Sequence, residues 1–183
     1  IVYSGAGDIL NLGTAGSGTW FQHSGIGDIT ATFGGDVTGS TDFTGIFVEH
    51  TGTAGNIDVT TNAGTTVAAG YTGIWLETGA GLTGDLSLTN NATIESIAGD
   101  TLERGIVSEH NGLGNNTVVN NGVIGSDTDR MLEHGILATI TNPASTGALN
   151  VSGTGDIFSA GIGLAASNVG SGLTTIDYTG AID

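Results

Sequence analysis

The chain has 183 residues, of which 18 are Asp or Glu and only 2 are Lys or Arg, so its formal charge at pH 7 is -16. A surface this acidic repels phosphate groups, which excludes nucleic acid as a partner and argues against binding to anionic lipid. The sequence contains no Cys, which excludes disulfides and every metal site that needs a thiolate.

The composition indicates a folded domain and not a linker. Hydrophobic residues make up 38% of the chain, enough to build a core despite the 34 glycines. No apolar run is long enough to span a bilayer, and the first residues lack the basic and apolar segments of a signal peptide. We therefore expect one domain with no direct membrane insertion.

A short motif that begins with Gly and continues with alternating apolar residues returns along the chain. Its copies are 18–23, 45–50, 73–78, 105–110, 135–140 and 161–166, and their glycines step by 27, 28, 32, 30 and 26 residues. Two further families of short alternating segments follow the first: 57–60, 86–89, 117–120, 149–152 and 176–179, and then 65–67, 93–97, 123–124 and 156–158. Alternation is the strand period, and a motif returning at nearly constant spacing indicates a solenoid.

The predicted fold is therefore all-β: a single-stranded, right-handed parallel β-helix of about six coils of 26 to 32 residues, with three short strands in each coil. A β-sandwich would also give many short strands, but it would not return one motif with the same inward positions. Gly, Thr, Asn and Ser recur too often, and β-branched residues are too abundant, for helices.

The repeat also predicts which side chains point inward. One interior file is expected to contain Ile46, Ile74, Ile106, Ile136 and Ile162, and a second to contain Phe21, Val48, Leu76, Ala138 and Leu164, interrupted by Ser108. The glycines that open the motif, and Asn62, Asn91 and Asn121 after the second strand, are expected at corners where a positive φ is tolerated. Stacked Asn side chains could also hydrogen-bond along the rod.

The whole chain, residues 1–183, is interpreted as one β-solenoid segment. The segment 1–3 (Ile-Val-Tyr) resembles 176–178 (Ile-Asp-Tyr), so both ends are expected at the same point of a coil. Neither end has a polar capping repeat, and open solenoid edges invite aggregation. We therefore expect the segment to be excised from a longer rod.

Two outward columns of the first strand are candidate binding residues. One column reads Trp20, Phe47, Trp75, Val107, Leu137 and Gly163, and the next reads Gln22, Glu49, Glu77, Glu109, Thr139 and Ala165. Aromatic rings beside polar acceptors suit sugars, and exposed apolar patches mark contact sites. A loop or a neighbouring chain covering the aromatic residues is the alternative. The predicted binding residues are Trp20, Phe47, Trp75, Gln22, Glu49, Glu77 and Glu109.

Stacked carboxylates repel one another unless neighbours neutralise them. His23, His50 and His110 follow Gln22, Glu49 and Glu109, and are interpreted as hydrogen-bonded corner residues or, alternatively, as charge partners of the carboxylates. A divalent metal between Glu49 and Glu77 is weighed, but calcium sites usually gather backbone oxygens in a dedicated loop, so no metal or cofactor is predicted. The acidic group Asp127, Asp129 and Glu133 lacks the pattern of calcium-binding β-rolls.

An enzyme is not predicted. Hydrolysis of a neutral glycan needs two carboxylates at a defined separation, such as Glu77 and Glu109, but any stack of carboxylates offers such pairs by accident. The charge of -16 suits no anionic polysaccharide.

Gly-Ile strand starts, abundant Thr, Asn and Gly, scarce Lys and no Cys together resemble the passenger region of bacterial autotransporters, the type V secreted proteins. The resemblance implies a parallel β-helix that is secreted and displayed on the bacterial cell surface. It further implies an adhesin that mediates adhesion or cell-to-cell self-association, with a protein or glycan of a host or neighbouring cell as partner. A filament subunit that stacks end to end and a polysaccharide-active β-helix are the alternatives.

Overall fold

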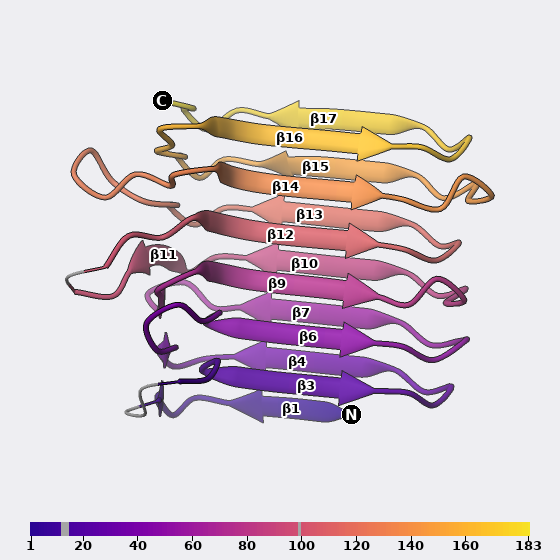
Figure 1. The fold of residues 1–183 in the computed structure, drawn as a ribbon, viewed down its shortest axis with the longest axis horizontal. Helices are drawn as coiled ribbons and strands as arrows, with labels where there is room; N and C mark the ends of the chain where they lie inside the picture. The colour runs from indigo at the N-terminus through magenta and orange to yellow at the C-terminus, as the bar shows by residue number, and fades with distance from the viewer. Residues whose placement is uncertain (12–14, 99) are drawn as a thin grey trace.

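The computed structural model describes residues 1–11, 15–98 and 100–183, and over these residues every regular element is a strand. The strands form three parallel sheets that wind as a β-solenoid of about six coils. In Figure 1 the sheet nearest the viewer points right and the sheet behind it points left while the chain climbs from N to C, so the coils are right-handed. The predicted fold class is confirmed.

The front sheet of Figure 1 has six strands and is built from the Gly-led motif. They are β3 (Thr19–His23), β6 (Ile46–His50), β9 (Thr72–Thr78), β12 (Arg104–His110), β14 (His134–Ile140) and β16 (Ile162–Asn168). Each strand pairs in parallel with the same segment of the next coil. Residues about 28 positions apart are therefore vertical neighbours, about 4.8 Å apart.

The other two sheets close each coil. The seven-stranded sheet contains β1 (Val2–Gly5), β4 (Ile29–Phe33), β7 (Ile57–Thr61), β10 (Leu86–Asn90), β13 (Asn116–Asn120), β15 (Leu149–Gly153) and β17 (Thr174–Tyr178). The four-stranded sheet contains β2 (Ile9–Leu10), β5 (Val37–Thr38), β8 (Thr66–Ala69) and β11 (Thr93–Ser96), and isolated bridges continue its line through Ile124, Ile157 and Ile182.

The core is a set of vertical files of apolar side chains. Ile46, Ile74, Ile106 and Ile136 lie in one file and are fully buried, as predicted. The prediction for the last coil is wrong by two residues: Leu164 pairs with Ile136, while Ile162 pairs with His134 and is 53% exposed. The motif could begin at Gly161 or at Gly163, because an apolar residue follows each glycine. In the structure it begins at Gly163, so that Leu164 and not Ile162 continues the interior file.

The second strand family was also misaligned at two places. Asn116, and not Thr117, lies opposite Leu86, and Ile176 lies opposite Val151. Because side chains alternate with a period of two, the slip of one residue reverses the faces of the strand. Asn116 therefore points inward, where it accepts a hydrogen bond from Ser108 Oγ at 2.7 Å and donates to Ser108 O at 2.9 Å.

The ends of the chain are consequently not equivalent. Tyr3 pairs with Ala31, and the vertical file that begins with this pair ends at Ile176. Tyr178 lies two residues further along its strand, in the file that begins at Gly5. The resemblance between residues 1–3 and 176–178 therefore does not mark the same point of a coil.

The glycines that open the motif serve close packing and not a positive φ, so that prediction is wrong. Gly45, Gly73, Gly105 and Gly135 have no positive φ, but a Cβ at Gly105 would lie 2.6 Å from the carbonyl oxygen of Gly135. The backbones of neighbouring coils meet here with no room for a side chain. A substitution would push the coils apart.

Asn62, Asn91 and Asn121 likewise have no positive φ. The stacking is confirmed in part, since Asn121 Nδ2 donates to Asn91 Oδ1 at 3.0 Å. The stronger ladder is one residue earlier and fully buried: Thr61 Oγ1 donates to Asn90 Oδ1 and Asn90 Nδ2 donates to Asn120 Oδ1, each at 2.7 Å.

A second polar ladder lies at the start of the seven-stranded sheet. We call Asp28, Asn56, Asp85 and Asn115 the corner file. Each side chain accepts a hydrogen bond from the backbone N–H of the next coil: Asn56 N to Asp28 at 2.8 Å, Asp85 N to Asn56 at 2.9 Å, Asn115 N to Asp85 at 2.9 Å and Ala148 N to Asn115 at 2.8 Å. These residues tie consecutive coils together at the corner.

Candidate functional site

The outer face of the six-stranded sheet carries three stacked aromatic residues, Trp20, Phe47 and Trp75, which we call the aromatic stripe. Their strands are in register, so the rings lie on consecutive coils. The ring centroids of Trp20 and Phe47 are 5.9 Å apart, and those of Phe47 and Trp75 are 5.4 Å apart. Such tilted contacts stabilise the rings against one another and hold them as one surface.

The stripe is open to solvent at one end. Trp20 is 63% exposed, Phe47 and Trp75 are half-buried, and Val107 on the next coil is 2% exposed. The column continues through Leu137 to Ala165, so the prediction of Gly163 at its end is wrong by the same two-residue shift. In the next column Ser167, and not Ala165, follows Thr139.

Two residues further along the same strands lie Glu49, Glu77 and Glu109, which we call the glutamate ladder. They are direct neighbours on β6, β9 and β12. Gln22 Nε2 donates to Glu49 Oε2 at 2.7 Å, and Asn111 Nδ2 approaches Glu77 Oε1 at 3.5 Å. Among the described residues no Lys, Arg or His forms an ion pair with these carboxylates.

This arrangement disfavours negative charge at the centre of the ladder. The pKa of Glu77 is raised above its ordinary value, first because the side chain is partly buried and then because Glu109 and Glu49 repel its charge. Glu77 therefore holds a proton more readily than a free glutamate does. Ionisation of Glu77 therefore lowers the stability of the fold.

Glu49 and Glu77 form the floor of a groove of about 580 Å³ at the end of their strands. Its lining also includes Thr78 at the end of β9 with residues 79–80 after it, which we call the near wall, and Asn111 with the turn 141–143, which we call the far wall. Both turns protrude at the right-hand edge of Figure 1, where β9 and β14 end. Glu109 and the aromatic stripe lie outside this lining.

Hydrogen bonds hold the far wall in place across two coils. Asn142 Nδ2 donates to Ala80 O at 3.3 Å, although the two residues are 62 positions apart. Thr141 Oγ1 donates to Asn111 Oδ1 at 2.5 Å, and Asn111 N donates to Thr78 Oγ1 at 2.9 Å. The sequence did not predict this wall, because a contact that skips a coil leaves no repeat signal.

His50 and His110 are corner residues, which confirms the first of the two interpretations for them. In each residue Nε2 forms a hydrogen bond with a backbone carbonyl of the preceding coil. His50 Nε2 lies 2.8 Å from Gly27 O, and His110 Nε2 lies 2.9 Å from Gly84 O. Nδ1 accepts a hydrogen bond from the backbone N–H two residues later: His50 from Gly52 at 3.1 Å, and His110 from Gly112 at 3.0 Å. Both are fully buried in their corners. Burial lowers the pKa of His110 below its ordinary value, against smaller opposing effects of Gly84 and Asp85.

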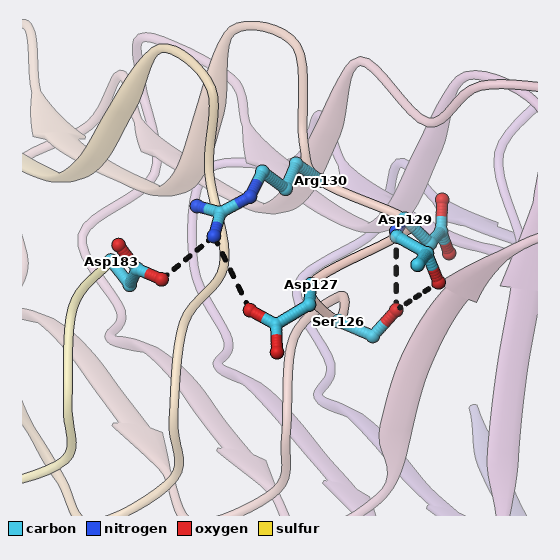
Figure 2. Close-up of polar contacts among 6 residues, drawn as sticks. Ser126, Asp127, Asp129, Arg130 and Asp183 are labelled. Carbon is cyan, nitrogen blue, oxygen red and sulfur yellow. Dashed lines mark hydrogen bonds and ion pairs between the residues drawn. The ribbon is translucent and has the colours of Figure 1, made fainter.

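A second hollow lies beyond the other end of these strands, in the segments that precede β12 and β14, beside Asp127, Asp129 and Arg130. Figure 2 shows Arg130 between the carboxylates of Asp127 and Asp183, at 3.4 and 2.7 Å. Asp129 is bound by Ser96, whose N and Oγ donate to it at 2.8 and 2.6 Å. No group of three His, Cys, Asp or Glu positioned to hold a metal occurs within residues 1–11, 15–98 and 100–183.

Comparisons with protein-family models, with curated proteins and with solved structures found no match to this chain. A search of the described residues for helices long and apolar enough to cross a membrane found none.

Proposed function

We propose that this chain is a segment of a secreted, surface-displayed rod of the autotransporter-passenger type that mediates bacterial adhesion or cell-to-cell association. The aromatic stripe and the adjacent glutamate ladder are its contact surface, and Gln22 extends that surface at the exposed end. The partner is a protein or glycan on a host or neighbouring cell.

The exposure of Trp20 carries the proposal. A Trp that is 63% exposed and held against Phe47 offers a large, rigid apolar surface at little entropic cost. A solvated face of a β-solenoid would ordinarily carry polar side chains there. Weak contacts on many copies of such a rod would add up through multivalency.

The test is attachment of beads coated with the intact chain to epithelial cells, to bacterial cells and to one another. Trp20→Ala should reduce attachment, because truncating an aromatic anchor typically costs about 2 kcal/mol or more. The matched control is Leu132→Ala, which removes a side chain that is 50% exposed away from the stripe. Attachment unchanged by Trp20→Ala, or absent from every surface, would refute the proposal.

End-to-end assembly of rods is a second candidate role. The outer coil exposes Leu173 by 73% and Ile176 by 54%, and a further coil of the same chain or a second copy would pair there. Polymers that form without any ligand and persist in Trp20→Ala would favour this role over adhesion.

A further inference from the structure

The groove has the size and the mixed lining of a small-molecule site. Its volume of about 580 Å³ lies within the usual range for such sites, roughly 300 to 1,000 Å³. Its rim includes the apolar side chains of Ala80 and Pro143, and its walls present amide and hydroxyl groups. Because Asn142 bridges to Ala80, the two walls are held at a fixed separation without a ligand.

The hydrogen-bonding capacity of the groove is largely unused. Glu77 receives one long contact, from Asn111 at 3.5 Å, and Glu49 receives one hydrogen bond, from Gln22 at 2.7 Å. Two carboxylates offer about eight acceptor sites, so most of these sites have no protein donor. A ligand rich in hydroxyl groups would supply those donors and accept from the amides.

Charge narrows the class of ligand. No Lys or Arg lines the groove and the chain carries -16, so uronic acids, sialic acids and phosphorylated sugars are repelled. A bare metal ion would need several convergent ligands, and the described residues hold no group of three His, Cys, Asp or Glu positioned to bind one. An uncharged polyhydroxylated ligand meets neither obstacle.

The aromatic stripe continues the groove. Trp75 and Glu77 are two residues apart on one face of β9, so their Cα atoms are separated by about 7 Å. A sugar ring bound over Glu77 therefore has a neighbouring ring within reach of Trp75. We propose that the groove is the subsite for one uncharged hexose unit of a neutral glycan whose next units stack on the stripe. This inference deepens the proposed adhesive function and rests on it.

The experiment is calorimetric titration of the intact chain with cellohexaose, maltohexaose and mannohexaose, with fully deacetylated chitohexaose and polygalacturonate as charged comparisons. At least one neutral hexasaccharide should bind. Asn142→Ala and Glu77→Ala should each weaken that binding about tenfold, the loss expected for one or two hydrogen bonds. Glu77→Gln should weaken it less, because the amide still accepts from a hydroxyl.

The matched control is Asn121→Ala, which removes an exposed Asn that bonds Asn91 at the corner after β10 and β13, away from the groove. It should leave the affinity unchanged, and thermal unfolding of each variant checks that it is folded. Binding of none of the neutral hexasaccharides would overturn the inference. Binding only of the fully deacetylated chitohexaose, abolished by Glu77→Gln, would overturn it too, because the ammonium groups of that sugar would then be the feature recognised.

The two proposals fail in different ways. If beads attach through Trp20 but groove variants bind and attach like wild type, the groove inference fails and the adhesive function stands. If a neutral hexasaccharide binds through Asn142 while beads attach to no surface, the adhesive function fails and the groove remains a sugar site.

Discussion

The corner file and the glutamate ladder are both vertical stacks that contain acidic side chains, and the two stacks differ in how those charges are spaced and bonded. In the corner file Asp alternates with Asn, so Asp28 and Asp85 lie two coils apart and each accepts a backbone N–H. In the glutamate ladder three carboxylates are direct neighbours, and the described residues supply no cation.

The comparison distinguishes carboxylates that stabilise the fold, in the corner file, from carboxylates that do not, in the glutamate ladder. A carboxylate that accepts backbone N–H groups stabilises the corner it occupies. A partly buried carboxylate between two like charges destabilises the fold whenever it ionises. Glu77 is therefore a better candidate for ligand binding than Asp85, although both are acidic side chains on the outside of the rod.

Acidification should destabilise the protein through His110, which directly follows the ladder. The pKa of His110 is lower in the folded protein than the ordinary 6.5, so the unfolded chain binds the proton at higher pH. Stability should therefore fall as the pH drops below about 6.5 and level off once folded His110 protonates. Protonation also places an N–H on the nitrogen that accepts from Gly112.

The measurement is urea unfolding at several pH values between 7.5 and about 5, together with NMR titration of the His110 ring. The ring should titrate at a lower pH than free histidine. Titration of His110 at or above the value for free histidine would contradict this prediction.

Asp85→Ala should also destabilise the protein. It removes the acceptor for Asn115 N and Nδ2, at 2.9 and 3.0 Å, and leaves the corner N–H to water. We expect a loss of about 1.5 kcal/mol in the free energy of unfolding, the lower end for hydrogen bonds to a charged group. Denaturant titration measures the loss. Asp58→Ala is the control, because Asp58 lies exposed on β7, and it should change stability by less than about 0.5 kcal/mol.

Glu77→Gln should have the smallest effect and the opposite sign. The raised pKa of Glu77 means that folding favours its protonated form, so stability is lost as the pH rises through and above the ordinary value of 4.5. At pH 7 the amide removes this penalty, and the variant should be more stable by less than about 1 kcal/mol, because solvent screens a partly exposed group.

Two further measurements sharpen the Glu77 prediction. The advantage of Glu77→Gln should disappear below about pH 4, where the wild-type carboxyl is protonated as well. It should also shrink in about 1 M salt, where the Debye length is about 3 Å. A Glu77→Gln variant less stable than wild type at pH 7 would mean that the ladder is compensated after all.

The sequence was sufficient to predict the winding and most of the interior. The Gly-Ile pairs at Gly45, Gly73 and Gly105 have no second Gly-apolar start two residues away, so these copies of the motif could be aligned in only one way. At Gly161 two glycines stand two residues apart, and at Asn116 the polar side chain concealed an inward position. Buried polar pairs such as Ser108 with Asn116 violate the apolar pattern that periodicity detects, so they could not be found from it.

The candidate site was predictable only in part. The columns that contain Trp20 and Glu77 follow from register, because in-register coils place equivalent residues on one line. The groove does not follow from register, since its far wall depends on how far the turn after β14 reaches down the rod. Turn conformations of this kind depend on individual contacts such as that of Asn142 with Ala80, and these vary from coil to coil.

The bridge from Asn142 to Ala80 also limits how a rod of this kind can change length. Solenoids grow and shrink by whole repeats, since each coil contacts only its neighbours and any coil can be followed by another. A duplication or loss outside residues 49–143 would leave the groove as it is. The same event between Ala80 and Asn142 would shift one wall by a full coil, so the number of repeats is constrained only where the lining residues must meet.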